Sequence, residues 1–113
     1  MATIYHNPRC RKSRETLALL EENGIQVDVV EYLKDVPSAK ELKGLLKKLS
    51  MKPEQLLRKG EAIFKEQFKG RTLTDDEWIE AMIAYPKLIE RPIVVQGNKA
   101  ALGRPPEQVL DLF

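Results

Sequence analysis

The sequence predicts an α/β fold in which a β-α-β unit is followed by a helical segment and then by a β-β-α unit. Two strand-like segments flank a helical pattern near the N-terminus, two capping-box patterns mark helices in the middle, and a hairpin signal precedes a short amphipathic segment at the end. A chain of 113 residues suits a single domain, residues 1–113, with a helical insertion at about residues 34–88.

The β-α-β unit begins with an extended segment at residues 3–5, which an Asn-Pro pair interrupts. From Arg11 onwards apolar residues recur at helical spacing as far as Gly24, a residue typical of helix ends. The segment IQVDVVEY, residues 25–32, is rich in β-branched residues, as expected of a strand. The helix is long enough to connect two parallel strands. Such crossover connections are almost always right-handed, so we expect a right-handed unit.

The middle of the chain predicts helices with marked boundaries. Two capping-box patterns start the longer helices, a proline and a glycine delimit two shorter ones between them, and a second proline ends the last helix. In chain order these boundary residues are Ser38, Glu41, Pro53, Gly60, Thr74, Glu77 and Pro86.

The final part of the chain predicts two strands and a helix. Residues 92–104 hold two apolar stretches on either side of a Gly-Asn pair at 97–98, which is the spacing of a β-hairpin. The closing segment PPEQVLDLF predicts a short amphipathic helix whose Val109, Leu110 and Phe113 are available to pack on the sheet.

Composition limits the class of protein. Apolar residues make up 42% of the chain and charged residues 32%, and no apolar run approaches the roughly 18 residues of a membrane span. The N-terminus lacks the apolar stretch of a signal peptide, and a lone cysteine suits a reducing compartment. We therefore expect a cytoplasmic protein without membrane association. The net charge of +2 and the interleaving of acidic with basic residues disfavour a nucleic-acid partner.

The stretch YHNPRCRKSRET contains the single histidine, His6, and the single cysteine, Cys10. Cys10 falls where a helix begins, so unpaired backbone N–H groups and the helix dipole favour its thiolate over its thiol. Four cations flank it in the sequence, namely Arg9, Arg11, Lys12 and Arg14. The charges of Arg9, Arg11 and Lys12, with a contribution from His6, should lower the thiol pKa further. The field of all four cations favours anions. The alternative is a small buried residue that merely packs.

Cys10 and Ser13 form a C-x-x-S pattern, in which the serine hydroxyl lies one helical turn on and is able to donate to the sulfur. The alternative for Ser13 is an ordinary residue of a first helical turn. A phosphatase-type loop needs an arginine six residues after the cysteine, and Thr16 occupies that place. A single thiol also excludes a dithiol mechanism within the chain.

Three arginines far from the cysteine lie at the edges of expected elements, namely Arg58, Arg91 and Arg104. Their guanidinium groups have the donor geometry for tetrahedral oxyanions, so convergence on Cys10 would create a site for an anionic substrate. Solvated surface residues are the alternative. Pro92, just before a strand, is a candidate for a cis peptide bond. We predict no metal site.

The segments YHNPRCRKSRETL, LLRKG, LIERPIVV and GRPPEQVLDLF, in this order over essentially the whole chain, resemble the glutaredoxin-coupled arsenate reductase (ArsC) family. The letters RKS after the cysteine, where well-characterised members have GTS, are similar to its relatives of unproven substrate. The resemblance implies a thioredoxin-like fold with a helical insertion and a cis proline at Pro92. It also implies the following roles: nucleophile for Cys10, support of the thiolate for His6 and Ser13, and oxyanion binding for Arg58, Arg91 and Arg104.

The activity implied by the resemblance is glutathione- and glutaredoxin-dependent reduction of arsenate to arsenite. The Cys10 thiolate attacks arsenate, glutathione reacts with the adduct, and glutaredoxin removes the glutathione. The expected partners are thus arsenate or a similar oxyanion, glutathione as co-substrate, and glutaredoxin, with no bound cofactor and a monomeric chain. Two alternatives stay open: a thiol oxidoreductase of the same family acting on another oxyanion or a glutathione adduct, and a non-enzymatic regulator that binds RNA polymerase.

Overall fold

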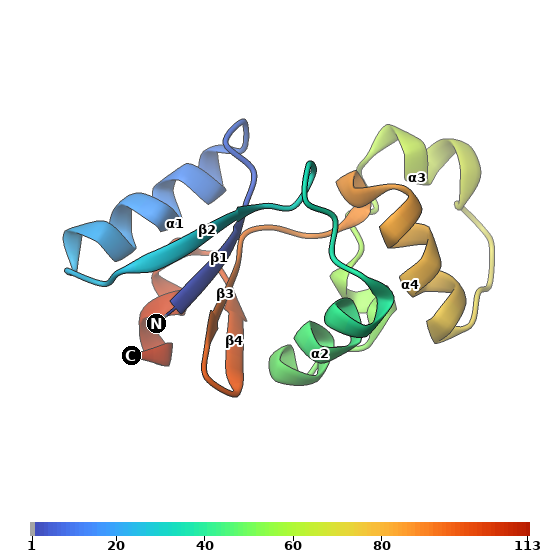
Figure 1. Ribbon diagram of the computed structural model, residues 1–113. Helices are drawn as coiled ribbons and strands as arrows, with labels where there is room; N and C mark the ends of the chain where they lie inside the picture. Colours follow the sequence, from blue (N-terminus) through green and yellow to red (C-terminus); the bar gives the residue numbers. More distant parts are fainter. Residues whose placement is uncertain (1) are drawn as a thin grey trace. The chain divides into compact units, whose positions relative to one another are not determined.

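A computed structural model describes residues 2–113 (Figure 1). The described chain divides into two compact units. The sheet unit contains the residues up to Asp35 together with Arg91–Phe113, and the helical unit is Val36–Glu90. The helical unit corresponds to the segment in which the sequence predicts an insertion, whereas a single domain made of both units stays a prediction. Within residues 2–113 no helix has the length and apolar character needed to cross a membrane.

The sheet unit is built on a four-stranded sheet with the order β2-β1-β3-β4. Strand β1, Ala2–His6, pairs in parallel with β2, Val27–Glu31, and helix α1, Arg11–Glu22, connects them (Figure 1). The predicted β-α-β unit is therefore confirmed. Gly24 has a φ of +71°, a conformation that glycine adopts without steric cost, and the chain turns there from α1 towards β2.

The other side of β1 pairs with a strand from the far end of the chain. Strand β3, Ile93–Gln96, runs antiparallel to β1, and β4, Lys99–Leu102, runs antiparallel to β3. The Gly-Asn pair forms the connecting turn, with Gly97 at a φ of +60°, which confirms the predicted hairpin. Strand β1 is thus a central strand that joins both ends of the sequence.

Helix α1 and the C-terminal segment cover one face of this sheet. Their common core contains Ile4, Leu20, Val94 and Val109, none of which has exposed surface. Burial alternates along β1, so that Ala2, Ile4 and His6 are buried and the residues between them are partly exposed. The alternation places His6 on the face that α1 covers, one residue before the loop that leads to Cys10.

The C-terminal segment differs from the prediction. It forms a 3-10 helix, η3, Pro106–Leu112, rather than an α-helix. Val109 is buried and Leu112 packs against the same core, whereas Phe113 is 47% exposed. A 3-10 helix has three residues per turn, so residues 109 and 112 share a face, as residues 109 and 113 would in an α-helix. The prediction that Phe113 packs on the sheet is wrong for this reason.

The helical unit contains both predicted capping boxes. Helix α2, Ala39–Leu49, begins after Ser38, and helix α4, Asp75–Ala84, begins after Thr74. In each case the N-cap side chain accepts the backbone N–H of a glutamate that in turn accepts the N-cap N–H. Two of the four N–H groups left unpaired at each helix start are thereby satisfied.

The segments between and after these helices are short. They form the 3-10 helix η1, Pro53–Leu56, the helix α3, Ala62–Gln67, and the 3-10 helix η2, Pro86–Leu88. Pro86 therefore starts a new turn directly after α4, where the sequence predicts a helix end. Large apolar side chains form the core of the unit, including Leu42, Leu46, Leu56, Trp78, Met82 and Leu88.

Candidate active site

The loop between β1 and α1 is held by its own hydrogen bonds. The side-chain oxygen of Asn7 accepts the N–H of Arg9 at 3.0 Å, and its backbone carbonyl accepts the N–H of Cys10 at 2.9 Å. The carbonyl of Pro8 accepts Nη1 of Arg14 at 3.0 Å. These contacts fix Cys10 at the N-cap position of α1. The first backbone N–H groups of the helix therefore point to the region of its sulfur.

Backbone and arginine groups converge on the sulfur of Cys10. Burial raises the pKa of the thiol, but the backbone N–H of Ser13, hydrogen bonding with the Arg91 side chain, the charge of Arg91 and the backbone N–H of Lys12 together hold the pKa below its ordinary value. Nη2 of Arg104 donates to Sγ at 3.7 Å. Cys10 as a residue is half-buried.

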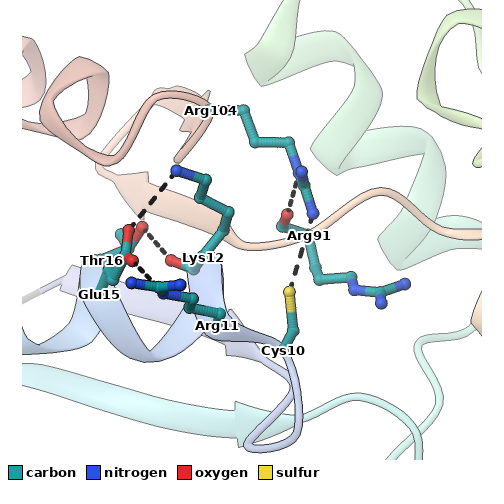
Figure 2. A network of polar contacts seen from close by, with 7 residues as sticks. All are labelled: Cys10, Arg11, Lys12, Glu15, Thr16, Arg91 and Arg104. Carbon is teal, nitrogen blue, oxygen red and sulfur yellow. Dashed lines mark hydrogen bonds and ion pairs between the residues drawn. The ribbon is translucent and has the colours of Figure 1, made fainter.

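Arg104 links the thiol to the bend that carries Arg91 (Figure 2). Its Nε donates to the carbonyl of Arg91 at 2.8 Å, while Nη2 of the same guanidinium reaches Cys10. The Arg91–Pro92 peptide bond is cis, as the resemblance implies. Two arginines that follow Cys10 in the sequence by more than 80 residues, the nearer being Arg91, thus lie beside its sulfur.

Gly103 allows this approach. Its N–H donates to the carbonyl of Pro92 at 2.9 Å. A Cβ atom at this position would meet both Oγ1 and Cγ2 of Thr16 on α1 and would lie 2.7 Å from Cγ of Pro92. Glycine is therefore required for the segment before Arg104 to lie against α1 and the Pro92 bend at once.

The cations next to Cys10 in the sequence are directed elsewhere. Nε of Arg11 lies 3.0 Å from one carboxylate oxygen of Glu15, and Nζ of Lys12 lies 3.6 Å from the other (Figure 2). Arg14 turns back to the loop carbonyl of Pro8. The spacings of three and four residues bring each pair together on the outer face of the helix.

The prediction that Arg11 and Lys12 lower the thiol pKa through their side chains is therefore corrected, while the same prediction for Arg9 stays a prediction. Residue 12 contributes its backbone N–H, and the side-chain charge comes from Arg91. In the first turn of a helix, the side chains of successive residues are directed outwards from the helix axis. The site is instead completed by chain segments that pack across the end of the sheet.

The hydroxyl of Ser13 faces the strand rather than the sulfur. Oγ accepts the N–H of Asn7 at 3.0 Å and lies 2.6 Å from Nδ1 of His6. The expected donation from this hydroxyl to Cys10 is replaced by a bond from the backbone N–H of Ser13. Burial lowers the His6 pKa, the charge of Glu31 opposes this and that of Arg14 adds to it. The lowered pKa favours the neutral ring over the imidazolium, and the support of the thiolate by His6 stays a prediction.

Arg58 lies in the helical unit, where two carboxylates hold it. Its Nη1 donates to Glu90 at 3.0 Å, and its Nε lies 3.6 Å from Glu61. The backbone N–H of Arg58 donates to the carbonyl of Leu88 at 2.7 Å, which anchors the residue beside η2. All three charged side chains are about one-quarter exposed, with 25% for Arg58. The role of Arg58 in oxyanion binding stays a prediction.

Two residues that position the site were not singled out from the sequence. The Asn-Pro pair predicts only the end of a strand, yet the side chain of Asn7 also shapes the loop, and an Asn before a proline is a known signal for such turns. Gly103 precedes Arg104 without any turn pattern that would mark it. In the part of the chain that the structure describes, no three His, Cys, Asp or Glu side chains gather as metal ligands do.

Comparison with known proteins places this arrangement in a family. The sequence profile described as the ArsC family matches residues 5–112. A protein of Escherichia coli K12, named uncharacterized protein YfgD, is 51% identical over 96% of this chain and 93% of its own length. An arsenate reductase of Haemophilus influenzae is 45% identical over 97% of both chains. The structure of an arsenate reductase from Vibrio cholerae matches with a TM-score of 0.95 and 50% identity, over 99% of this chain and 97% of that one. The chain, with its thioredoxin-like fold, belongs to the ArsC family.

Proposed function

We propose that this protein reduces arsenate, or a closely similar oxyanion, through the single thiolate of Cys10 and an external thiol. One observation carries the proposal: backbone N–H groups at the start of α1 and the side chains of Arg91 and Arg104 converge on the sulfur of the half-buried Cys10. Such donors bind the oxygens of a tetrahedral anion and stabilise charge that develops on them. The names of relatives such as the Haemophilus influenzae protein supply arsenate as the oxyanion.

The first half of the reaction forms a bond between sulfur and arsenic. The Cys10 thiolate attacks arsenic(V), and one arsenate oxygen takes up protons and leaves as water. Arg91 and Arg104 neutralise the remaining oxygens, which otherwise repel the incoming sulfur anion. A thiol that stays ionised at neutral pH is required for this step, because the thiolate is the nucleophile.

The second half transfers two electrons to arsenic. A glutathione thiolate attacks the sulfur of Cys10, the As–S bond breaks, and its electron pair stays on arsenic, which leaves as arsenite. Cys10 and glutathione are then joined by a disulfide. A second thiol, from glutaredoxin, attacks the glutathione sulfur and releases the Cys10 thiolate. The chain has one cysteine, so both reducing thiols come from outside.

Arsenite formation by the purified protein tests the proposal. With arsenate, glutathione and glutaredoxin present, we expect arsenite to accumulate, and Cys10→Ser to abolish it. Arg91→Ala and Arg104→Ala should raise the arsenate concentration needed for half-maximal rate by roughly tenfold or more, since each removes a charged hydrogen-bond donor. Lys99→Gln, on the hairpin strand β4, is the matched charge control. Absence of arsenite at saturating arsenate would contradict the proposal.

A further inference from the structure

Four exposed cationic side chains surround Cys10 in the sequence without acting on its sulfur. We call them the basic collar: Arg9, Arg11, Lys12 and Arg14. The Arg11 side chain is 84% exposed and that of Lys12 is 47% exposed. In Figure 2 both turn away from the sulfur, on the outer side of α1. The collar is therefore distinct from the donors that bind the thiolate.

The basic collar accounts for the net positive charge of the chain. Four of the 19 basic residues lie within it, and one of the 17 acidic residues, Glu15, adjoins it. The remainder of the chain then has 15 basic and 16 acidic residues. A cluster of this kind beside the half-buried Cys10 attracts anions that approach from solvent.

The side-chain charges of Arg11 and Lys12 contribute little to the stability of the fold. Arg11 and Lys12 share the single carboxylate of Glu15, in ion pairs exposed enough to contribute little to the free energy of unfolding. The charges of four neighbouring cations also repel one another. A ligand with negative charge is the partner that relieves this repulsion.

We propose that the basic collar is the docking surface for a small thiol that carries carboxylates, the class to which glutathione belongs, and that it selects this donor by charge. The inference rests on the proposed function for its need of an external thiol. The carboxylates of the donor pair with the collar while its sulfur reaches Cys10. An uncharged thiol of equal reactivity gains nothing from the collar and reacts more slowly.

A disulfide exchange at Cys10 measures this selection without any oxyanion. The protein is first converted to its Cys10 mixed disulfide with 2-thiopyridine, an uncharged group. The thiolate of a donor then attacks the Cys10 sulfur, the S–S bond to the pyridine breaks, and pyridine-2-thiolate leaves and absorbs light. Second-order rate constants are compared for two thiols, 3-mercaptopropionate, whose carboxylate is anionic, and 2-mercaptoethanol, which has no other charged group. Each rate constant is expressed relative to the concentration of the thiolate form of the donor.

On the protein disulfide, the rate constant of the anionic thiol divided by that of the neutral thiol should exceed the same ratio measured on a small pyridyl disulfide. Replacing both Arg11 and Lys12 by glutamine should lower the ratio by roughly twofold for each charge removed, and Glu15→Gln should raise it by about twofold. Lys99→Gln should leave it unchanged. Lys99 pairs with Gln96 at the end of the β3-β4 hairpin, and β3 runs back along β1, so this control lies at the opposite end of the sheet from Cys10.

Salt provides a second readout on the folded wild-type protein. Raising the ionic strength from about 0.01 M to about 1 M should bring the ratio down to that of the small disulfide. A wild-type ratio equal to that of the small disulfide, or one that neither the collar variants nor salt change, would overturn the proposal. Loss of arsenite formation with an intact ratio would instead overturn the proposed function, because this exchange uses no arsenate.

Discussion

The hydroxyl of Ser13, in the first turn of α1, lies 2.6 Å from Nδ1 of His6, and both residues are buried. The same oxygen accepts the N–H of Asn7 at 3.0 Å. This arrangement joins the end of β1, the loop and the helix start. It also holds the backbone N–H of Ser13 towards Cys10, so the serine acts on the thiol through its position.

Ser13→Ala should therefore lower the free energy of unfolding clearly, while it changes the pKa of the Cys10 thiol only slightly. The variant leaves the N–H of Asn7 and the ring of His6 buried without this oxygen, so the free energy of unfolding should fall by about 1–3 kcal/mol. The backbone N–H of residue 13 is retained, and the pKa of Cys10 should rise less than in Arg91→Ala. Urea unfolding and the pH dependence of alkylation measure the two effects. A large rise of the Cys10 pKa at unchanged stability would show that the hydroxyl acts on the sulfur directly.

Protonation of His6 should destabilise the folded protein. Burial is the largest cause of its lowered pKa, opposed by the charge of Glu31 and assisted by that of Arg14, so the unfolded chain binds a proton first as the pH falls. The stability due to the neutral ring is complete above the unfolded pKa of about 6.5 and is lost as the pH falls through the lower pKa of the folded state. The advantage of wild type over His6→Gln in free energy of unfolding should shrink between about pH 7.5 and pH 5. An advantage that stays constant would contradict a neutral His6.

Alkylation of Cys10 should be fast at neutral pH. Burial raises the thiol pKa, but the backbone N–H groups and Arg91 together lower it by more than burial raises it. A larger share of the thiol is therefore ionised than in a free cysteine. The pH at which the rate of alkylation by iodoacetamide is half-maximal should lie below the ordinary thiol pKa of about 8.5. The substitution Arg91→Ala should raise this pH. Lys99→Gln should leave it in place. A wild-type midpoint at the ordinary value would refute the activation of Cys10.

Gly103→Ala tests the close approach before Arg104. The added methyl group meets Thr16 and Pro92, so the free energy of unfolding should fall by about 1–3 kcal/mol and the Cys10 pKa should rise as Arg104 is displaced. Thr16→Ala in the same chain removes the two Thr16 atoms that the methyl group meets, and it should recover part of the pKa shift.

Gly44→Ala is the matched control for this substitution. Gly44 lies inside α2 with no atom within 4 Å of an added Cβ, and the change should stabilise the protein by about 0.5–1 kcal/mol. Equal effects of the two substitutions on stability would contradict a special role for Gly103. Thermal or urea unfolding of the three variants gives the comparison.

The sequence predicted the order of the elements well because their signals are local. Capping boxes, a Gly-Asn turn and β-branched runs depend on neighbours a few residues apart. The C-terminal segment is harder to predict, since seven residues that begin with the second of two prolines are too few for periodicity to distinguish a 3-10 helix from an α-helix. The exposure of Phe113 follows from that difference in pitch.

The candidate site was predictable in part. The place of Cys10 at the start of a helix predicts that it is the nucleophile. Proximity in the sequence does not predict which cations contact its sulfur. Arg11 and Lys12 have Glu15 at helical spacing, a pattern that already indicates an ion pair on the surface. Arg91 and Arg104 are marked in the sequence only by their places at the edges of expected elements, and the resemblance assigns them to the site, since no local pattern shows which distant segments pack across the end of a sheet.

The position of β1 at the centre of the sheet has a consequence for protein synthesis. Cys10 is synthesised before the helical unit, whereas Arg91 follows that whole unit and Arg104 comes 13 residues after Arg91. A growing chain that ends before residue 91 contains the cysteine and neither cation. Because Arg91 is among the groups that lower the thiol pKa, full activation of Cys10 requires that the last hairpin has joined β1.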